Sequence, residues 1–216
     1  FAKYSMTHLI TAIEPSEDDP NFRDIYVQGK LAMTLSISAV EELKLTIEQP
    51  WDDETSNAVE TCTAIEDARH IAIDLISRRT WGCNELVRRL VKRGSDKTIA
   101  EQTVEQLCDD GWLDDHAFAC ALIRQWLRKE PAGRRWLQHK LYEKEIPQDI
   151  ANPAIDEELA GISEQDSADE FAAKRVAKTS GDDETVQRKV MAALNRKGFA
   201  LDVALRACRA AQEADN

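Results

Sequence analysis

Residues 107–118 read Leu107-Cys108-Asp109-Asp110-Gly111-Trp112-Leu113-Asp114-Asp115-His116-Ala117-Phe118, and they combine a helix stop with a helix start. Gly111 suits the left-handed position that ends many helices, because glycine has no Cβ to clash there. Asp114 suits the N-cap of the next helix, and Leu113 and Phe118 have the spacing of a hydrophobic staple. The stretch therefore predicts two helices that meet at a sharp angle.

Two motifs in this region resemble those of a known family. Residues 111–119 read Gly-Trp-Leu-Asp-Asp-His-Ala-Phe-Ala, which is similar to the Gly-aromatic-Leu-Asp-Asp-x-x-Phe-Ala signature of the RecX family of recombinase regulators. Residues 84–94 are similar to that family's x-E-L-x-x-K-L-x-x-K-G helix. The resemblance covers residues 66–212. It implies a non-catalytic protein that lodges in the groove of the RecA filament on DNA and restrains strand exchange, ATP hydrolysis and co-protease activity. Such a protein regulates DNA repair and the SOS response.

The composition is that of a globular protein, with 43% hydrophobic and 31% charged residues in a chain of 216. No apolar run approaches the roughly 18 residues of a membrane helix, so no membrane contact is expected. The start, Phe1–Met6, lacks the apolar core of a signal peptide. Five cysteines without C-x-x-C spacing argue against a disulfide framework or a zinc ribbon. A reduced, cytoplasmic protein is expected.

The first 50 residues carry the two-residue alternation that is typical of strands. Alternating runs cover Thr7–Ile13, Arg23–Val27 and Lys30–Leu35, and Gln28-Gly29 fits a tight hairpin turn. A small antiparallel unit of two or three strands is expected in residues 1–50. The acidic segment 51–65 is interpreted as a linker.

From about Ile65 the apolar residues follow a helical period and the chain repeats itself. Four apolar sets share spacings of 51 and 53 residues: Leu90, Leu141 and Leu194; Ile99, Ile150 and Val203; Val104, Ile155 and Cys208; Ala68, Ala119 and Ala172. These spacings predict three tandem repeats of three helices each, over 66–113, 114–162 and 163–216. The first helix is expected to begin at Glu66. The predicted fold is mainly α, an elongated curved array of repeats preceded by the small β unit.

The charge is unevenly distributed along the chain, which has a formal net charge of −12. Residues 1–67 carry a net charge of −10, residues 68–146 carry +3 and residues 147–216 carry −5. Binding to nucleic-acid phosphates needs concentrated lysine and arginine. Only the middle block meets that requirement, so the total charge opposes DNA binding by the chain as a whole.

Basic residues recur on the predicted middle helix of each repeat and, in the second repeat, also around the Glu130–Gly133 turn that precedes it, and together they are the candidate partner-binding surface. These residues are Arg88, Arg89, Lys92 and Arg93 in the first repeat, Arg124, Arg128, Lys129, Arg134, Arg135 and Lys140 in the second, and Arg188 and Lys189 in the third. Such runs are often no more than a solvated helix face. Repetition favours function, because stacked repeats would present these residues to a polymer. Trp136, beside Arg134 and Arg135, is the tryptophan best placed to join that surface.

No catalytic, metal or cofactor site is expected. The chain has no glycine-rich phosphate loop, no G-x-S-x-G and no H-E-x-x-H. The histidines are interpreted as scattered, and only His70 is expected to have a cysteine or an acidic residue at ligand spacing, namely Asp74, one helical turn away. The acidic residues around Gly111 are read as helix caps in the case of Asp114 and Asp115; Asp109 and Asp110 have no assigned role.

The sequence is compatible with three functions. The first is the regulator implied by the resemblance, whose partner is the RecA filament and which is expected to be a monomer. The second is a module that binds single- or double-stranded DNA without regard to sequence and without RecA. The third is a protein-interaction scaffold on which the basic helices are merely solvated.

Overall fold

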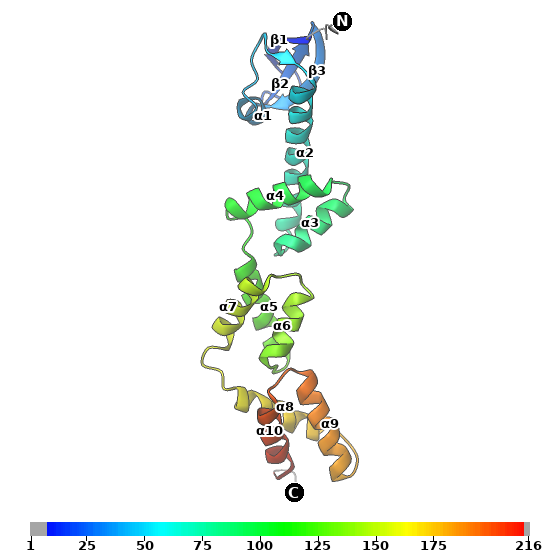
Figure 1. Ribbon diagram of the computed structural model, residues 1–216, viewed down its shortest axis with the longest axis vertical. Helices are drawn as coiled ribbons and strands as arrows, with labels where there is room; N and C mark the ends of the chain where they lie inside the picture. Colours follow the sequence, from blue (N-terminus) through cyan, green and yellow to red (C-terminus); the bar gives the residue numbers. More distant parts are fainter. Residues whose placement is uncertain (1–7, 214–216) are drawn as a thin grey trace, which may run out of the picture. The chain divides into compact units, whose positions relative to one another are not determined.

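The computed structural model describes residues 8–213, so Phe1–Met6 and the last three residues of the predicted third repeat lie outside the described residues. The chain divides into two compact units. One contains residues up to 78 together with 87–106, and the other contains 79–86 together with residues from 107 onward. Figure 1 shows the order of the elements, which comprise four strands and ten helices in the described part of the chain. No helix there combines the length and the apolar character that a membrane crossing requires.

The β unit is a four-stranded antiparallel sheet with the order β3-β2-β1-β4. Its strands are β1 (His8–Pro15), β2 (Phe22–Val27), β3 (Lys30–Ser36) and β4 (Pro50–Trp51). Gln28 and Gly29 join β2 to β3 with positive φ angles of 52° and 75°, which is the backbone of a type I′ hairpin turn. The prediction of two or three strands missed β4, because two residues are too short to show alternation.

Two helices complete the core of the β unit. They are α1 (Ile37–Glu42) and α2 (Asp53–Ile76). The core consists of Ile10, Ile25, Leu35, Ala39, Leu45, Val59 and Cys62, all buried, so the first half of α2 packs with the sheet. The Ser36 hydroxyl, which caps α1, also bonds to the Glu66 carboxylate of α2.

The predicted acidic linker is wrong, because α2 already begins at Asp53. The Asp52 carboxylate accepts a hydrogen bond of 2.8 Å from the Thr55 amide and caps the helix. Asp53 and Glu54 occupy the first turn, where negative charge is favoured by the helix dipole. The acidic residues that suggested a linker are therefore the start of a helix, and the predicted start at Glu66 was 13 residues too late.

The rest of the chain forms the predicted three-helix repeats. The remaining helices are α3 (Cys83–Lys92), α4 (Lys97–Asp109), α5 (Asp115–Lys129), α6 (Arg134–Tyr142), α7 (Gln148–Leu159), α8 (Glu164–Val176), α9 (Asp183–Arg196) and α10 (Leu201–Glu213). We call α5–α7 the second repeat and α8–α10 the third repeat, and each encloses its own hydrophobic core. Leu90, Leu141 and Leu194 are completely buried, as are Ala119 and Ala172. The mainly α fold with helical repeats is confirmed.

Each middle helix ends with the same backbone geometry. The amides of Ser95, Ile146 and Phe199 donate to the carbonyls of Leu90, Leu141 and Leu194, respectively, at 3.1–3.3 Å. The residue before each donor has a positive φ: Gly94 at 106°, Glu145 at 59° and Gly198 at 77°. This is the geometry of a Schellman-type helix end, and it sends the chain into the third helix of each repeat.

The second and third repeats meet backbone to backbone at two glycines. The Gly133 amide donates to the Lys197 carbonyl at 2.8 Å. A Cβ at Gly133 would lie 2.3 Å from the Gly198 carbonyl oxygen, and a Cβ at Gly198 would lie 2.2 Å from the Trp136 nitrogen. Only glycine at both positions permits this approach.

We expect Gly133→Ala to lower the free energy of unfolding by about 2–3 kcal/mol, because the added methyl group forces the two repeats apart. Gly133 has an ordinary negative φ, so the effect isolates the steric contact. The matched control is Gly161→Ala, where the φ of 77° costs about 1 kcal/mol but a Cβ meets nothing within 4 Å. Urea denaturation measures the free energy of unfolding of both variants. An equal decrease in the two variants would contradict the close contact at Gly133.

The cap at Asp52 predicts a pH dependence. Its hydrogen bonds from Thr55 lower the pKa of the carboxyl below its ordinary value near 4. The contribution to stability is therefore present above that value and is lost as the pH falls through the lowered pKa. In urea denaturation between pH 6 and pH 3, Asp52→Ser, which keeps a capping oxygen, is expected to lose less stability than the wild type. A steeper loss in the variant would contradict this role.

Candidate partner-binding surface

The turn from α4 to α5 contains the predicted end of one helix and the predicted start of the next. Gly111 has a φ of 76°, and the Trp112 amide donates to the Leu107 carbonyl at 2.9 Å. Asp114 caps α5 by accepting from the Ala117 amide at 2.9 Å. Leu113 and Phe118 are both buried, whereas Trp112 is 52% exposed. This turn positions α5, which carries part of the candidate surface.

Asp115 has a role that sequence reasoning missed. Its carboxylate accepts a hydrogen bond of 2.8 Å from the amide of Cys83, the first residue of α3. A Cβ at Gly82 would lie 2.9 Å from the Phe118 ring and 3.3 Å from the Asp115 carboxylate, so a glycine is needed at this contact. The Cys83 sulfur also lies 2.9 Å from that of Cys108. Burial, followed by the contact with Cys108, raises the pKa of the Cys83 thiol.

The first group of predicted basic residues lies along α3 and just after its end. Arg88 and Lys92 are one helical turn apart, as are Arg89 and Arg93, while the opposite face buries Leu86 and Leu90. Arg88, Lys92 and Arg93 are exposed, and Arg89 is half-buried. Among the described residues, Lys92 and Arg93 have no acidic partner.

The second group is mostly engaged within the protein. Arg124 pairs with Glu158 at 3.1 Å, Lys140 pairs with Glu143 at 2.6 Å, and Arg134 pairs with Asp156. The bond from Arg134 lowers the pKa of Asp156. Arg128 and Lys129, in the last turn of α5, are exposed and have no acidic partner in the part of the chain that the structure describes.

The junction between the second and third repeats is formed by Arg135, Trp136 and Lys197. The Arg135 guanidinium donates to the Phe199 carbonyl at 2.6 Å. The Lys197 ammonium lies 2.6 Å from the Glu130 carboxylate and 4.6 Å from the centre of the Trp136 ring. Trp136 in turn packs edge to face on Trp126, with ring centroids 5.7 Å apart. These residues have a structural role at the junction, and a partner-binding role for Arg135 stays a prediction.

The third group lies on α9. Arg188 is exposed and has no acidic partner among residues 8–213. The Lys189 ammonium donates to the Ser180 carbonyl at 3.2 Å, near the start of its own helix. Each middle helix thus carries basic residues as predicted, but only some of them are available to a partner.

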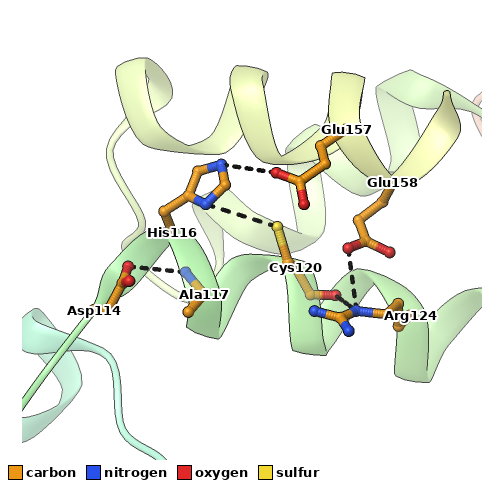
Figure 2. A network of polar contacts seen from close by, with 7 residues as sticks. All are labelled: Asp114, His116, Ala117, Cys120, Arg124, Glu157 and Glu158. Atoms are coloured by element: carbon orange, nitrogen blue, oxygen red, sulfur yellow. Dashed lines mark hydrogen bonds and ion pairs between the residues drawn. The ribbon is translucent and has the colours of Figure 1, made fainter.

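The histidines are less scattered than predicted. His116 and Cys120 lie one turn apart on α5, and His139 and Glu143 have the same spacing on the surface, with 3.2 Å between Nε2 and the carboxylate. The expectation that only His70 has such a neighbour is therefore wrong. Asp74 itself pairs with Arg78 at 2.8 Å. Figure 2 shows His116 and Cys120 facing Glu157, which comes from α7.

Comparison with known proteins identifies relatives that match part of the chain. A family model described as the third three-helix domain of RecX matches residues 163–208. A regulatory protein RecX of Chlorobium phaeobacteroides is 30% identical over 129 residues, which cover 60% of this chain and 83% of the relative. A regulatory protein RecX of Mycobacterium leprae is 31% identical over 143 residues, covering 62% of this chain and 79% of the relative.

Two crystal structures share the fold. One, of a regulatory protein RecX, has a TM-score of 0.72 at 21% identity and covers 91% of this chain and 96% of its own. The other, of RecX from Lactobacillus salivarius, has a TM-score of 0.56 at 18% identity and covers 70% of this chain and 98% of its own. At these identities the likeness concerns the fold alone.

The contact between Asp115 and Cys83 can be tested by removing the acceptor. We expect Asp115→Ala to lower the free energy of unfolding by about 1–2 kcal/mol, because it leaves a part-buried amide without its partner. The control is Asp109→Ala, which removes an exposed carboxylate from the unfavourable C-terminal end of α4. Urea denaturation should show little change or a slight gain for that control. Equal destabilisation by both variants would argue against the contact.

Proposed function

The chain belongs to the RecX family of regulatory proteins, and we propose that it is a non-catalytic modulator of the RecA recombinase that binds the groove of the RecA filament on DNA. Bound there, it restrains strand exchange, ATP hydrolysis and co-protease activity, and so regulates DNA repair and the SOS response. The repeats proposed at 66–113, 114–162 and 163–216 supply the contacts. Regulation then follows from occupancy of the groove and needs no chemistry by this chain.

The observation that supports the proposal is a set of exposed basic side chains without an acidic partner among the described residues. The set comprises Lys92, Arg93, Arg128, Lys129 and Arg188, and it draws on the middle helix of the first repeat, the end of α5 and α9. Their charges are not neutralised within the molecule, so an anionic partner can neutralise them. A set that recurs from repeat to repeat matches a partner that is itself periodic, such as a filament.

The total charge favours a protein filament over bare DNA as the main partner. The net charge of −12 repels a polyanion at long range, and only residues 68–146 are net positive. A protein partner can present its negative charges singly, whereas a DNA duplex carries one for about every 1.7 Å of its axis.

We expect Lys92→Ala/Arg93→Ala to raise the concentration needed for half-inhibition of RecA ATP hydrolysis by about tenfold, which corresponds to about 1.4 kcal/mol of binding free energy. The reason is the loss of two exposed cations from the proposed surface. The measurement adds the protein to preformed RecA filaments on single-stranded DNA. A fluorescently labelled chain gives the filament affinity in parallel.

The matched control is Arg78→Ala/Lys97→Ala. It removes the same charge from the same compact unit, but each of these residues already pairs with an acidic residue one turn away, at 2.8 Å and 3.5 Å. This control should inhibit like the wild type. If the Lys92→Ala/Arg93→Ala variant lost as much affinity for bare DNA as for RecA filaments, the result would favour a module that binds DNA without RecA. No inhibition by the wild type at several-fold excess over RecA would overturn the proposal.

A further inference from the structure

A cluster of three potential metal ligands lies in the second repeat. His116 and Cys120 project from the same side of α5, because residues four apart share a helix face. Glu157 projects toward them from α7, which packs against α5 (Figure 2). One donor atom from each side chain lies within 4.8 Å of the other two.

The distances are close to those of a coordination sphere. The two ring nitrogens of His116 face different partners: Nδ1 lies 3.9 Å from the Cys120 sulfur, and Nε2 lies 3.6 Å from the Glu157 carboxylate. A metal ion binds only one of these nitrogens, and with one donor atom counted for each residue the three atoms lie within 4.8 Å of one another. In a tetrahedral zinc site with bonds of about 2.0–2.3 Å, the donor atoms are about 3.5 Å apart. A movement of about 1 Å by the half-buried His116 and the exposed Glu157 side chains brings the donor atoms to that spacing. Cys120 is 2% exposed and holds its place.

We propose that His116, Cys120 and Glu157 bind a divalent transition-metal ion such as Zn²⁺. The thiolate and the imidazole select such an ion over Mg²⁺ and Ca²⁺, which prefer sites made only of oxygen ligands. One thiolate and one carboxylate neutralise the 2+ charge. Three protein ligands leave one position for water or for a side chain of a partner.

The charged neighbours of the cluster are compatible with a bound cation. Arg124 donates to the Cys120 carbonyl at 3.3 Å, but its guanidinium is paired with Glu158 at 3.1 Å, so its positive charge is offset (Figure 2). Burial raises the pKa of the Cys120 thiol, so the side chain is a neutral thiol without metal. When the metal–sulfur bond forms, the thiol proton is released to solvent.

A bound ion would join the first and third helices of the second repeat. Glu157 lies on α7 and the other two ligands lie on α5, so the ion adds a link between two elements that already share a core. Metal that binds only the folded chain stabilises it in proportion to the logarithm of the metal concentration over the dissociation constant. This site is independent of the proposed regulation of RecA and can be tested on the isolated protein.

The first experiment titrates the full chain with Co²⁺, in the presence of a reductant that carries no thiol. We expect one Co²⁺ per chain, a near-ultraviolet charge-transfer band from the cobalt–thiolate bond and visible d–d bands of a four-coordinate ion. Zn²⁺ should abolish both features, and Mg²⁺ should leave them unchanged. Zn²⁺ should also raise the unfolding temperature of the wild type.

Variants assign the ligands. Cys120→Ser should remove the charge-transfer band, and Glu157→Gln, which alters an exposed side chain and leaves the core intact, should weaken Co²⁺ binding at least tenfold. His116→Gln should do the same. The matched control is His139→Gln, because His139 and Glu143 form a surface pair of the same spacing without a thiol; it should bind like the wild type.

Three outcomes would overturn the proposal. The first is a wild-type chain that shows no thiolate band at several-fold excess of Co²⁺. The second is a band that persists in Cys120→Ser, which would assign the sulfur ligand to another cysteine, such as the adjacent pair Cys83 and Cys108. The third is equal weakening by His116→Gln and His139→Gln, which is the signature of adventitious surface binding only.

Discussion

One backbone hydrogen bond recurs wherever the chain turns from the middle to the third helix of a repeat, and the packing of each repeat depends on it. The acceptors are Leu90, Leu141 and Leu194, whose side chains are also completely buried. The same leucine therefore closes the helix with its carbonyl and fills the core with its side chain. Displacing it would disturb both, which explains why the three positions keep one residue type.

The second repeat forms this turn without glycine. Glu145 takes the left-handed conformation that Gly94 and Gly198 take elsewhere, at a cost of about 1 kcal/mol. The side-chain amide of Asn84 donates to the Glu145 carbonyl at 2.7 Å, which helps to hold the turn. A contact from residue 84 thus supports a conformation at residue 145 that local sequence disfavours.

Features that depend on local pattern were predictable, and features that depend on distant residues were not. The spacings of 51 and 53 residues correctly identified the buried leucines Leu90, Leu141 and Leu194, and the Gly111 turn followed from glycine and capping chemistry alone. The start of α2 was missed because acidic residues suit both a linker and the first turn of a helix. The bond from Cys83 to Asp115 joins residues 32 apart, and no short motif encodes it. The pair His116 and Cys120, by contrast, was readable from its spacing, and only Glu157 required the structure.

Position within a helix explains why some basic residues stay unpaired although acidic residues outnumber them. The last turn of a helix exposes backbone carbonyls, and the partial negative charge there favours cations without any acidic side chain. Lys92 in α3 and Arg128 and Lys129 in α5 occupy such turns. Their charges are stabilised by the backbone yet remain at the surface, whereas Arg124, one turn earlier in α5, is held by Glu158. A helix C-terminus therefore lets an acidic protein keep local positive charge available to a partner.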